Sequence, residues 1–270
     1  MKGKAFLVVL FIICFCMPAF SLTSCPRCRY KIGIDTGKCP KCLFQINLEW
    51  SQKKEIKSTI TVRSGYDTFI RHPHADNRAY KSNKNAGGDK TGEIGVWGGS
   101  STLRYLIRFR IDSALEYYGI DYRTFKKKKA FLFLSVLPKN NNLEIPVVIY
   151  PLTRSFTPGY DVFRERKRIP NGCTWFNATA AMPWEHEGGD FEQQCCSKGI
   201  LKSGIRNQID VTNIIKYFFE LSQRTGEWNA PGMIIMSDPS DRSVNLGFVT
   251  IYSFDTKDFS LRPELYIQAK

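Results

Sequence analysis

Apolar residues recur at every second position along most of this 270-residue chain, and this alternation limits the fold more than any other feature. The clearest run is LRYLIRFRI at residues 103–111, where the odd positions are apolar and the even positions include three arginines. Because successive side chains of a strand point to opposite faces, this pattern is typical of a strand with one face in a core. Shorter runs of the same period occur at residues 60–62, 68–70, 94–96, 130–137, 145–150, 205–211, 233–236, 248–252 and 265–267. About ten short strands, separated by Gly, Pro, Asn and Asp, predict an all-β fold, an antiparallel sandwich or barrel.

One segment has a helical period instead. Apolar residues at positions 214, 215, 218, 219 and 221 fall on one face of a helix. Asp210 or Thr212 can cap its start, and Gly226 lies just past its end. We therefore expect a single amphipathic helix packed against the sandwich.

The first 21 residues have the layout of a secretory signal peptide. Lys2 and Lys4 precede an apolar run, Pro18 interrupts it, and the tripeptide AFS supplies small residues for cleavage. No apolar run reaches the roughly 20 residues that a membrane span needs. The sequence therefore predicts a secreted or cell-surface protein without a membrane span.

The chain is strongly basic, with a formal net charge of +14. Loss of residues 1–21 removes two lysines and no acids, which leaves 14 − 2 = +12. A charge of this size attracts polyanions, and outside a cell the candidates are acidic polysaccharides and other cell-envelope glycans. We do not expect nucleic acid to be the partner. The alternative is a solvated basic surface without a dedicated partner.

Four cysteines near the N-terminus form two C-x-x-C pairs, CPRC and CPKC, separated by ten residues. This spacing predicts a structural zinc ribbon in residues 22–45, with Cys25, Cys28, Cys39 and Cys42 as ligands. Two disulfides are the alternative in an oxidising compartment. The sequence LTSC, which ends at Cys25, also resembles a lipobox, and a lipid anchor on Cys25 would exclude the zinc site. Residues 46–60 are then a linker or edge strand, and residues 61–270 are the sandwich domain.

Three further cysteines, Cys173, Cys195 and Cys196, bracket the stretch TWFNATAAMPWEHEGGDF at residues 174–191. A disulfide from Cys173 to either member of the adjacent pair would close this stretch into a loop and leave one thiol. The sequence does not decide the pairing.

Several segments resemble, in order, the DNRLRE-type domain, which is grouped with carbohydrate-binding module family 96. They are GYDTFIRHP, NKNAGG, EIGVWGGSSTLRYLIRF, the 174–191 stretch, IDVTNIIKYF, WNAPGMIIMSDP and TIYSFDTKDFSLRPELYI, within residues 62–269. The resemblance implies a prokaryotic, secreted or cell-surface jelly-roll sandwich that serves as a non-catalytic module, with alginate-like uronides among the ligands. The four-cysteine segment lies outside the family pattern, and Arg110 stands where the family usually has Asp.

Sugar binding needs a flat aromatic face with polar or cationic groups beside it. Alternate residues of a strand lie about 6.6 Å apart on one face, so the arginines of residues 103–111 would share one face and form a candidate anion ladder. The alternative is that they pair with carboxylates of neighbouring strands. Trp175 is expected in the core. The candidate carbohydrate-binding residues are Arg71, Trp97, Arg104, Arg108, Trp184 and His186.

Acids at loop ends of such sandwiches are candidate calcium ligands, here chiefly Asp67 and Asp190. The three histidines, His72, His74 and His186, could instead form the metal site of an enzyme. The favoured function is a non-catalytic module that binds an acidic polysaccharide. The alternatives are a structural or adhesive module that holds other proteins through the zinc ribbon, and, third, a polysaccharide-degrading enzyme. The glycan and the oligomeric state are left open.

Overall fold

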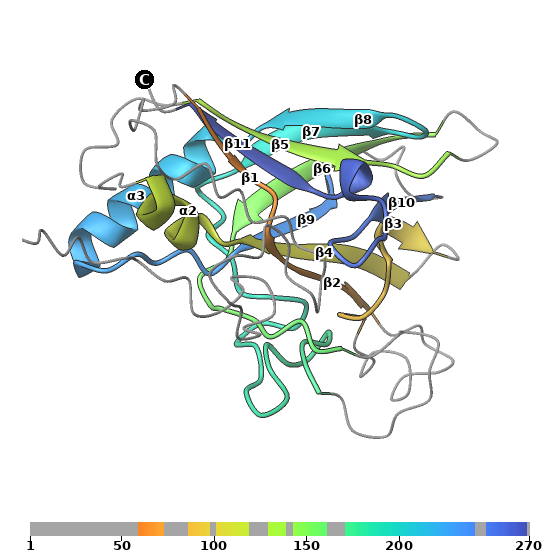
Figure 1. Ribbon diagram of the computed structural model, residues 1–270. Coiled ribbons are helices and arrows are strands. Elements are labelled where there is room, and N and C mark those ends of the chain that lie inside the picture. The colour runs from red at the N-terminus through yellow and green to blue at the C-terminus, as the bar shows by residue number, and fades with distance from the viewer. Residues whose placement is uncertain are drawn as a thin grey trace, which may run out of the picture. The chain divides into compact units, whose positions relative to one another are not determined.

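The computed structural model describes residues 59–72, 86–97, 101–118, 129–138, 143–160, 171–240 and 247–268 (Figure 1). The chain divides into two compact units, Met1–Lys53 and Lys54–Lys270, and every described residue belongs to the second. The predicted signal peptide, the four-cysteine segment and His74 therefore lie outside the described residues. Most of the predicted linker does so too, and its last two residues begin the first strand.

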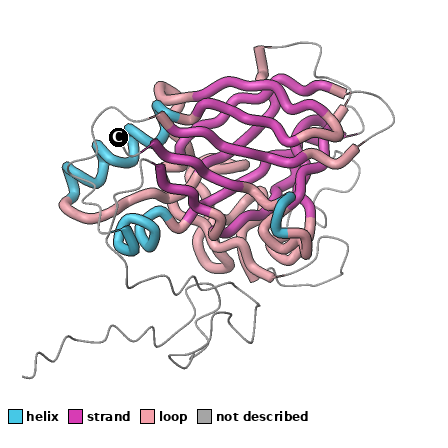
Figure 2. The backbone as a smooth tube through the Cα atoms, turned by 45° about the horizontal axis from the view of Figure 1, so that its top comes forward, coloured by secondary structure: helices cyan, strands magenta, loops and turns pink. Residues whose placement is uncertain are grey.

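Two antiparallel sheets make up the fold, and Figure 2 shows their strands as layers with the longer helices at one side. The first sheet has four strands in the order β1 (Thr59–Val62), β11 (Glu264–Gln268), β5 (Ala130–Ser135) and β8 (Arg206–Asp210). The second has seven strands. Six follow the order β10 (Phe248–Tyr252), β3 (Thr91–Trp97), β4 (Ser101–Phe109), β9 (Met233–Ser237), β6 (Glu144–Pro151) and β7 (Ser197–Lys202), and β2 (Gly65–Arg71) pairs with β4. The predicted all-β antiparallel sandwich is confirmed.

Strand β4 is the centre of the larger sheet. Leu103 is opposite Arg71 of β2 and also opposite Gly95 of β3, so β2 and β3 must lie on different edges of β4. Tyr105 is likewise opposite a residue of β2 and opposite Ile235 of β9. Strands β3 and β9 therefore share one edge of β4, and β2 occupies the other.

The main core lies between the two sheets. The odd residues of β4, from Leu103 to Phe109, are all buried in it, as the alternation predicts. The smaller sheet faces them with apolar side chains of β5 and β11, namely Leu132, Leu134, Leu265 and Ile267. Each such buried aliphatic side chain stabilises the fold by about 1.5–3 kcal/mol relative to an exposed one.

The predicted amphipathic helix is confirmed as α3 (Thr212–Thr225). Its apolar face packs Ile214, Ile215, Phe218 and Phe219 against the core. The Asp210 carboxylate accepts the N–H of Thr212 at 2.9 Å, and Gly226 ends the helix with a left-handed φ of 79°. None of the helices in the described part of the chain is long and apolar enough to cross a membrane.

Two other elements differ from the sequence-based expectation. The alternation continues through Ile111, but β4 ends at Phe109 and Ile111 begins a second helix, α2 (Ile111–Tyr118). Ile111 and Leu115 are buried together because residues four apart share one helix face. Strand β7 was not predicted, because only its neighbouring residues Ile200 and Leu201 are large and apolar. A short 3-10 helix, Phe259–Leu261, precedes β11.

Candidate functional site

A second, smaller core lies on the outer face of the seven-stranded sheet. The even residues of the strands, such as Ile70, Leu106 and Val148, point into it. The segment that follows β6 covers this face, and Figure 1 shows it beyond β2 and β4, away from the smaller sheet. It contributes Leu152, Phe156, Cys173, Trp175, Ala178 and Trp184. The chemically dense stretch at residues 174–191 is therefore largely the cover of this second core.

Thr174 and Trp184 fold the covering segment back on itself. The Thr174 hydroxyl oxygen accepts the N–H groups of Phe176 at 3.2 Å and Asn177 at 3.1 Å. The indole N–H of Trp184 donates to the Thr174 carbonyl at 3.1 Å. Trp175 is buried, as expected, but Trp184 is also only 6% exposed. The proposed role of Trp184 in stacking on a sugar is therefore wrong, because neither face of its ring is open to solvent.

Arg104 lies beneath the same segment. Its guanidinium carbon is 4.7 Å from the centroid of the Trp175 ring, and its Nη1 donates to the Gly188 carbonyl at 2.7 Å. Burial lowers the pKa of Arg104 to about 10. Arg104 is half-buried, and its described contacts are a backbone carbonyl and a ring rather than the carboxylate of a neighbouring strand.

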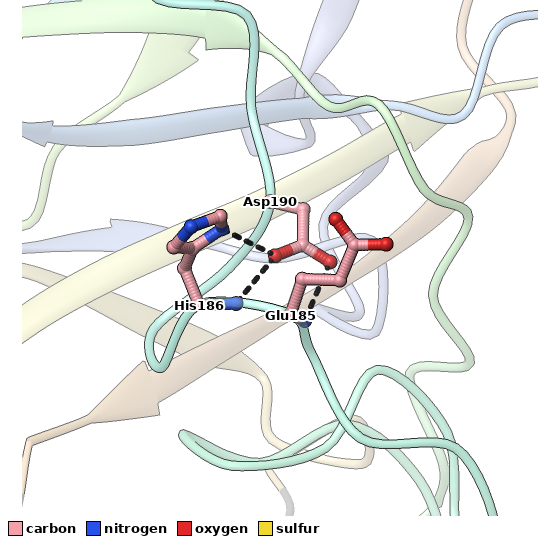
Figure 3. Close-up of side chains that lie close together, drawn as sticks. All are labelled: Glu185, His186 and Asp190. Atoms are coloured by element: carbon pink, nitrogen blue, oxygen red, sulfur yellow. Dashed lines mark hydrogen bonds and ion pairs between the residues drawn. The ribbon is translucent and has the colours of Figure 1, made fainter.

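The tip of the segment brings Glu185, His186 and Asp190 together, as Figure 3 shows. The two carboxylate oxygens of Asp190 accept the N–H groups of Glu185 at 3.0 Å and His186 at 2.8 Å. His186 Nδ1 lies 3.5 Å from Asp190 Oδ1, with its side chain 84% exposed. Arg154 enters the same cluster, 2.7 Å from Glu185 Oε1 and 3.4 Å from Asp190 Oδ2.

This arrangement does not suit the calcium site predicted at Asp190. A calcium ion needs about six to eight oxygen ligands, and here both Asp190 oxygens already accept backbone N–H groups. The guanidinium of Arg154 would also repel a cation at the cluster. Asp190 is better understood as the group that shapes the loop, and His186 as an exposed residue beside it.

Asp67, the other predicted calcium ligand, lies inside the main core. Its Oδ2 accepts the Tyr105 hydroxyl at 2.5 Å and the N–H of Phe254 at 2.7 Å. Burial raises its pKa from 3.8 to about 7. A buried carboxyl group that favours its protonated form is a poor cation ligand, so these surroundings do not fit calcium.

The structure does bring together two of the predicted carbohydrate-binding residues, Arg71 and Trp97. The guanidinium carbon of Arg71 lies 4.1 Å from the centroid of the Trp97 ring. Arg71 is 8% exposed, and its Nη2 has no hydrogen-bond partner among the described residues. Burial lowers its pKa, and nearby Glu93 opposes that shift. Trp97 is 42% exposed, so its ring is the part of this pair that faces solvent.

Arg108 is half-buried on the outer face of β4, directly opposite Tyr66 of β2. Arg110 follows β4 and lies over the Tyr66 ring at 4.7 Å. The row of arginines is thus divided, with Arg104 against Trp175 and with Arg108 and Arg110 near Tyr66.

The three disulfide candidates, Cys173, Cys195 and Cys196, lie in or against the two cores, and a disulfide between Cys173 and either of the others stays a prediction. Cys173 is fully buried in the second core. Cys195 packs against the main core and Cys196 against the second one, because adjacent residues of an extended segment point to opposite sides.

A surface groove of about 760 Å³ lies where α3 begins. It is lined by Lys129, Cys196, Ser197, Lys198, Asp210, Thr212, Asn213 and Lys216. Sequence reasoning missed this groove, since its three lysines are spread over 88 positions (216 − 129 + 1) and belong to no motif.

Comparison with models of protein families and with curated proteins found no match to this chain.

Proposed function

We propose that this protein is a secreted, non-catalytic module that binds an acidic polysaccharide, with Trp97 and Arg71 in the binding site. The observation that supports it most directly is the contact between these two side chains, 4.1 Å from guanidinium carbon to ring centroid. Such a pair combines an apolar ring, which can cover one side of a pyranose, with a positive charge that attracts a uronate carboxylate.

The position of Arg71 favours this role. Arg71 is buried, its Nη2 atom included, while the Trp97 ring is 42% exposed, so the guanidinium holds the indole in one orientation before any ligand arrives. An aromatic group that is already ordered loses little entropy on binding. The charge is also partly removed from water, which strengthens its attraction for an anion.

The sequence adds two further arguments. The formal net charge of +14 favours association with polyanions. The resemblance to DNRLRE-type domains, which includes the strands that carry Arg71 and Trp97, implies a polysaccharide-binding module on a sandwich. Secretion is proposed on the predicted signal peptide.

Affinity electrophoresis through alginate and pectate tests the proposal. We expect retention of the parent protein, no retention in neutral dextran, and a decrease in raised salt because exposed charges are screened. Trp97→Ala should weaken retention about tenfold, which is about 1.4 kcal/mol of lost stacking.

Tyr117→Ala is the matched control. Tyr117 is 43% exposed and lies on α2, which follows the far end of β4, whereas Trp97 pairs with the first residue of β4. Equal loss in the two variants would show that the site is wrongly assigned. Absence of retention of the parent protein would count against polysaccharide binding itself and would favour the structural or adhesive module.

A further inference from the structure

The groove beside α3 is a second surface feature with a definite chemistry. Its walls come from four places in the sequence: Lys129 just before β5, Lys198 in β7, Asp210 at the end of β8, and the first turns of α3. Backbone contacts tie these walls together. The Thr212 hydroxyl accepts the N–H of Ala130 at 3.0 Å, and the Ala130 carbonyl accepts the N–H of Val211 at 2.9 Å.

The charged side chains in the groove differ in whether the protein itself provides a partner of opposite charge. Lys198 pairs with Asp238 at 2.7 Å, so its charge is compensated within the protein. Asp210 accepts the N–H of Thr212 and lies against the positive end of α3. Lys129 and Lys216 are both exposed, and neither ammonium group has an ion pair or hydrogen bond with the described residues. Two lysines without an ion pair to the described residues therefore line the groove, beside one carboxylate, that of Asp210.

We propose that this groove binds a dianionic oxyanion group, a phosphate or a sulfate, between Lys129 and Lys216. An ammonium group is a compact charge with three donors, and two of them suit an anion whose oxygens point in several directions. The Ser197 and Thr212 hydroxyls and the Asn213 amide line the same groove and offer neutral donors. A uronate carboxylate carries one negative charge and would balance only one of the two lysine charges.

This site is separate from the proposed polysaccharide site. Figure 1 shows α3 and β3, which carries Trp97, at opposite sides of the fold. The proposal therefore does not depend on polysaccharide binding.

Isothermal titration of the full chain with inorganic phosphate and with inorganic sulfate, at low chloride, tests the proposal. The double variant Lys129→Gln/Lys216→Gln should bind the preferred ion about tenfold more weakly, because two unit charges leave the groove. Both lysines are exposed, so the variant should keep the parent thermal melting curve.

Lys90→Gln/Lys257→Gln is the matched control, since it removes the same charge from exposed positions outside the groove. It should bind the ion as the parent protein does. Equal losses in the two double variants would reduce the effect to net charge and overturn the site. Failure of the parent protein to bind either ion would also overturn it.

Raising the pH separates the two ligand classes. Inorganic phosphate gains its second charge near neutral pH, whereas sulfate keeps the same charge throughout. A phosphate site should bind inorganic phosphate more tightly at about pH 8 than at about pH 6. A sulfate site should bind sulfate in preference to phosphate at both pH values.

Discussion

The hydroxyl group of Tyr105 donates a 2.5 Å hydrogen bond to Oδ2 of Asp67 in the interior of the sandwich. The same oxygen accepts the N–H of Phe254, which ties β2 and β4 to the segment after β10. Gly92 leaves room for the ring, since a Cβ atom there would lie 2.3 Å from it. Burial raises the pKa of Asp67 to about 7, because the ionised carboxylate is poorly solvated in the core.

This buried carboxyl group should make the free energy of unfolding depend on pH. Between its unfolded pKa of 3.8 and its folded pKa of about 7, the folded protein binds a proton that the unfolded chain has released. Its stabilising contribution is therefore complete below pH 3.8 and is lost as the pH rises through 7. Asp67→Asn keeps an oxygen acceptor but cannot titrate. Urea denaturation should show that the parent protein's advantage over this variant is larger at about pH 5 than at about pH 8.

Asp258→Asn gives the opposite case. The Ser260 hydroxyl and N–H groups lower the pKa of Asp258, so its contribution is present above an unfolded pKa of 3.8 and is lost only as the pH falls. The difference in the free energy of unfolding between the parent protein and Asp258→Asn should therefore be the same at the two pH values used for Asp67→Asn. If the free energy of unfolding of Asp67→Asn also differed from that of the parent protein by the same amount at both pH values, the raised pKa of Asp67 would be contradicted.

The main core could be predicted from the sequence because the period of two in β4 survives in the folded protein. The burial of Trp184 could not be predicted from the sequence. It depends on the second core, which forms only when the segment after β6 packs on the outer face of the larger sheet. A weak signal for that core was present. The runs VVIY of β6 and MIIM of β9 are apolar at consecutive positions, which is typical of strands buried on both faces.

Gly188 should be among the residues of the covering segment that tolerate substitution least. Its φ is +86°, and a Cβ there would lie 2.5 Å from Arg104 Nη1 and 2.7 Å from the Trp175 ring. Gly188→Ala therefore combines backbone strain with displacement of two packed side chains. We expect a loss of about 3 kcal/mol in the free energy of unfolding, measured by urea denaturation.

Gly226→Ala separates the two causes. Gly226 has a similar φ of +79°, but apart from its own chain neighbours no atom of the described residues lies within 4 Å of the added Cβ. This variant should lose only the cost of a left-handed alanine, about 1 kcal/mol. Equal losses at the two positions would mean that the contact of Gly188 with Arg104 and Trp175 is not as close as described.

Helix α2 and the arginine row show why local pattern can mislead. Ile111 continues the period of two, so nothing in the alternation marks the point where β4 ends. Arg104 and Arg108 occupy equivalent positions of one strand face, yet Arg104 donates to the covering segment and Arg108 lies opposite Tyr66. The difference is made by tertiary contacts. The zinc site at Cys25, Cys28, Cys39 and Cys42 stays a prediction.

Arg104→Met tests whether Arg104 supports the fold or binds an anion. The variant removes the stack on Trp175 and leaves the Gly188 carbonyl without its donor, so the free energy of unfolding should fall by about 2 kcal/mol. Retention on alginate, measured well below the melting temperature, should match that of Arg63→Met. That control removes the same charge from a side chain that is 72% exposed and pairs with Glu264, and it should cost less than about 1 kcal/mol. If fully folded Arg104→Met were retained more weakly than Arg63→Met, Arg104 would be an anion-binding residue after all. The two variants have equal charge, so only a direct contact with the polysaccharide would distinguish them.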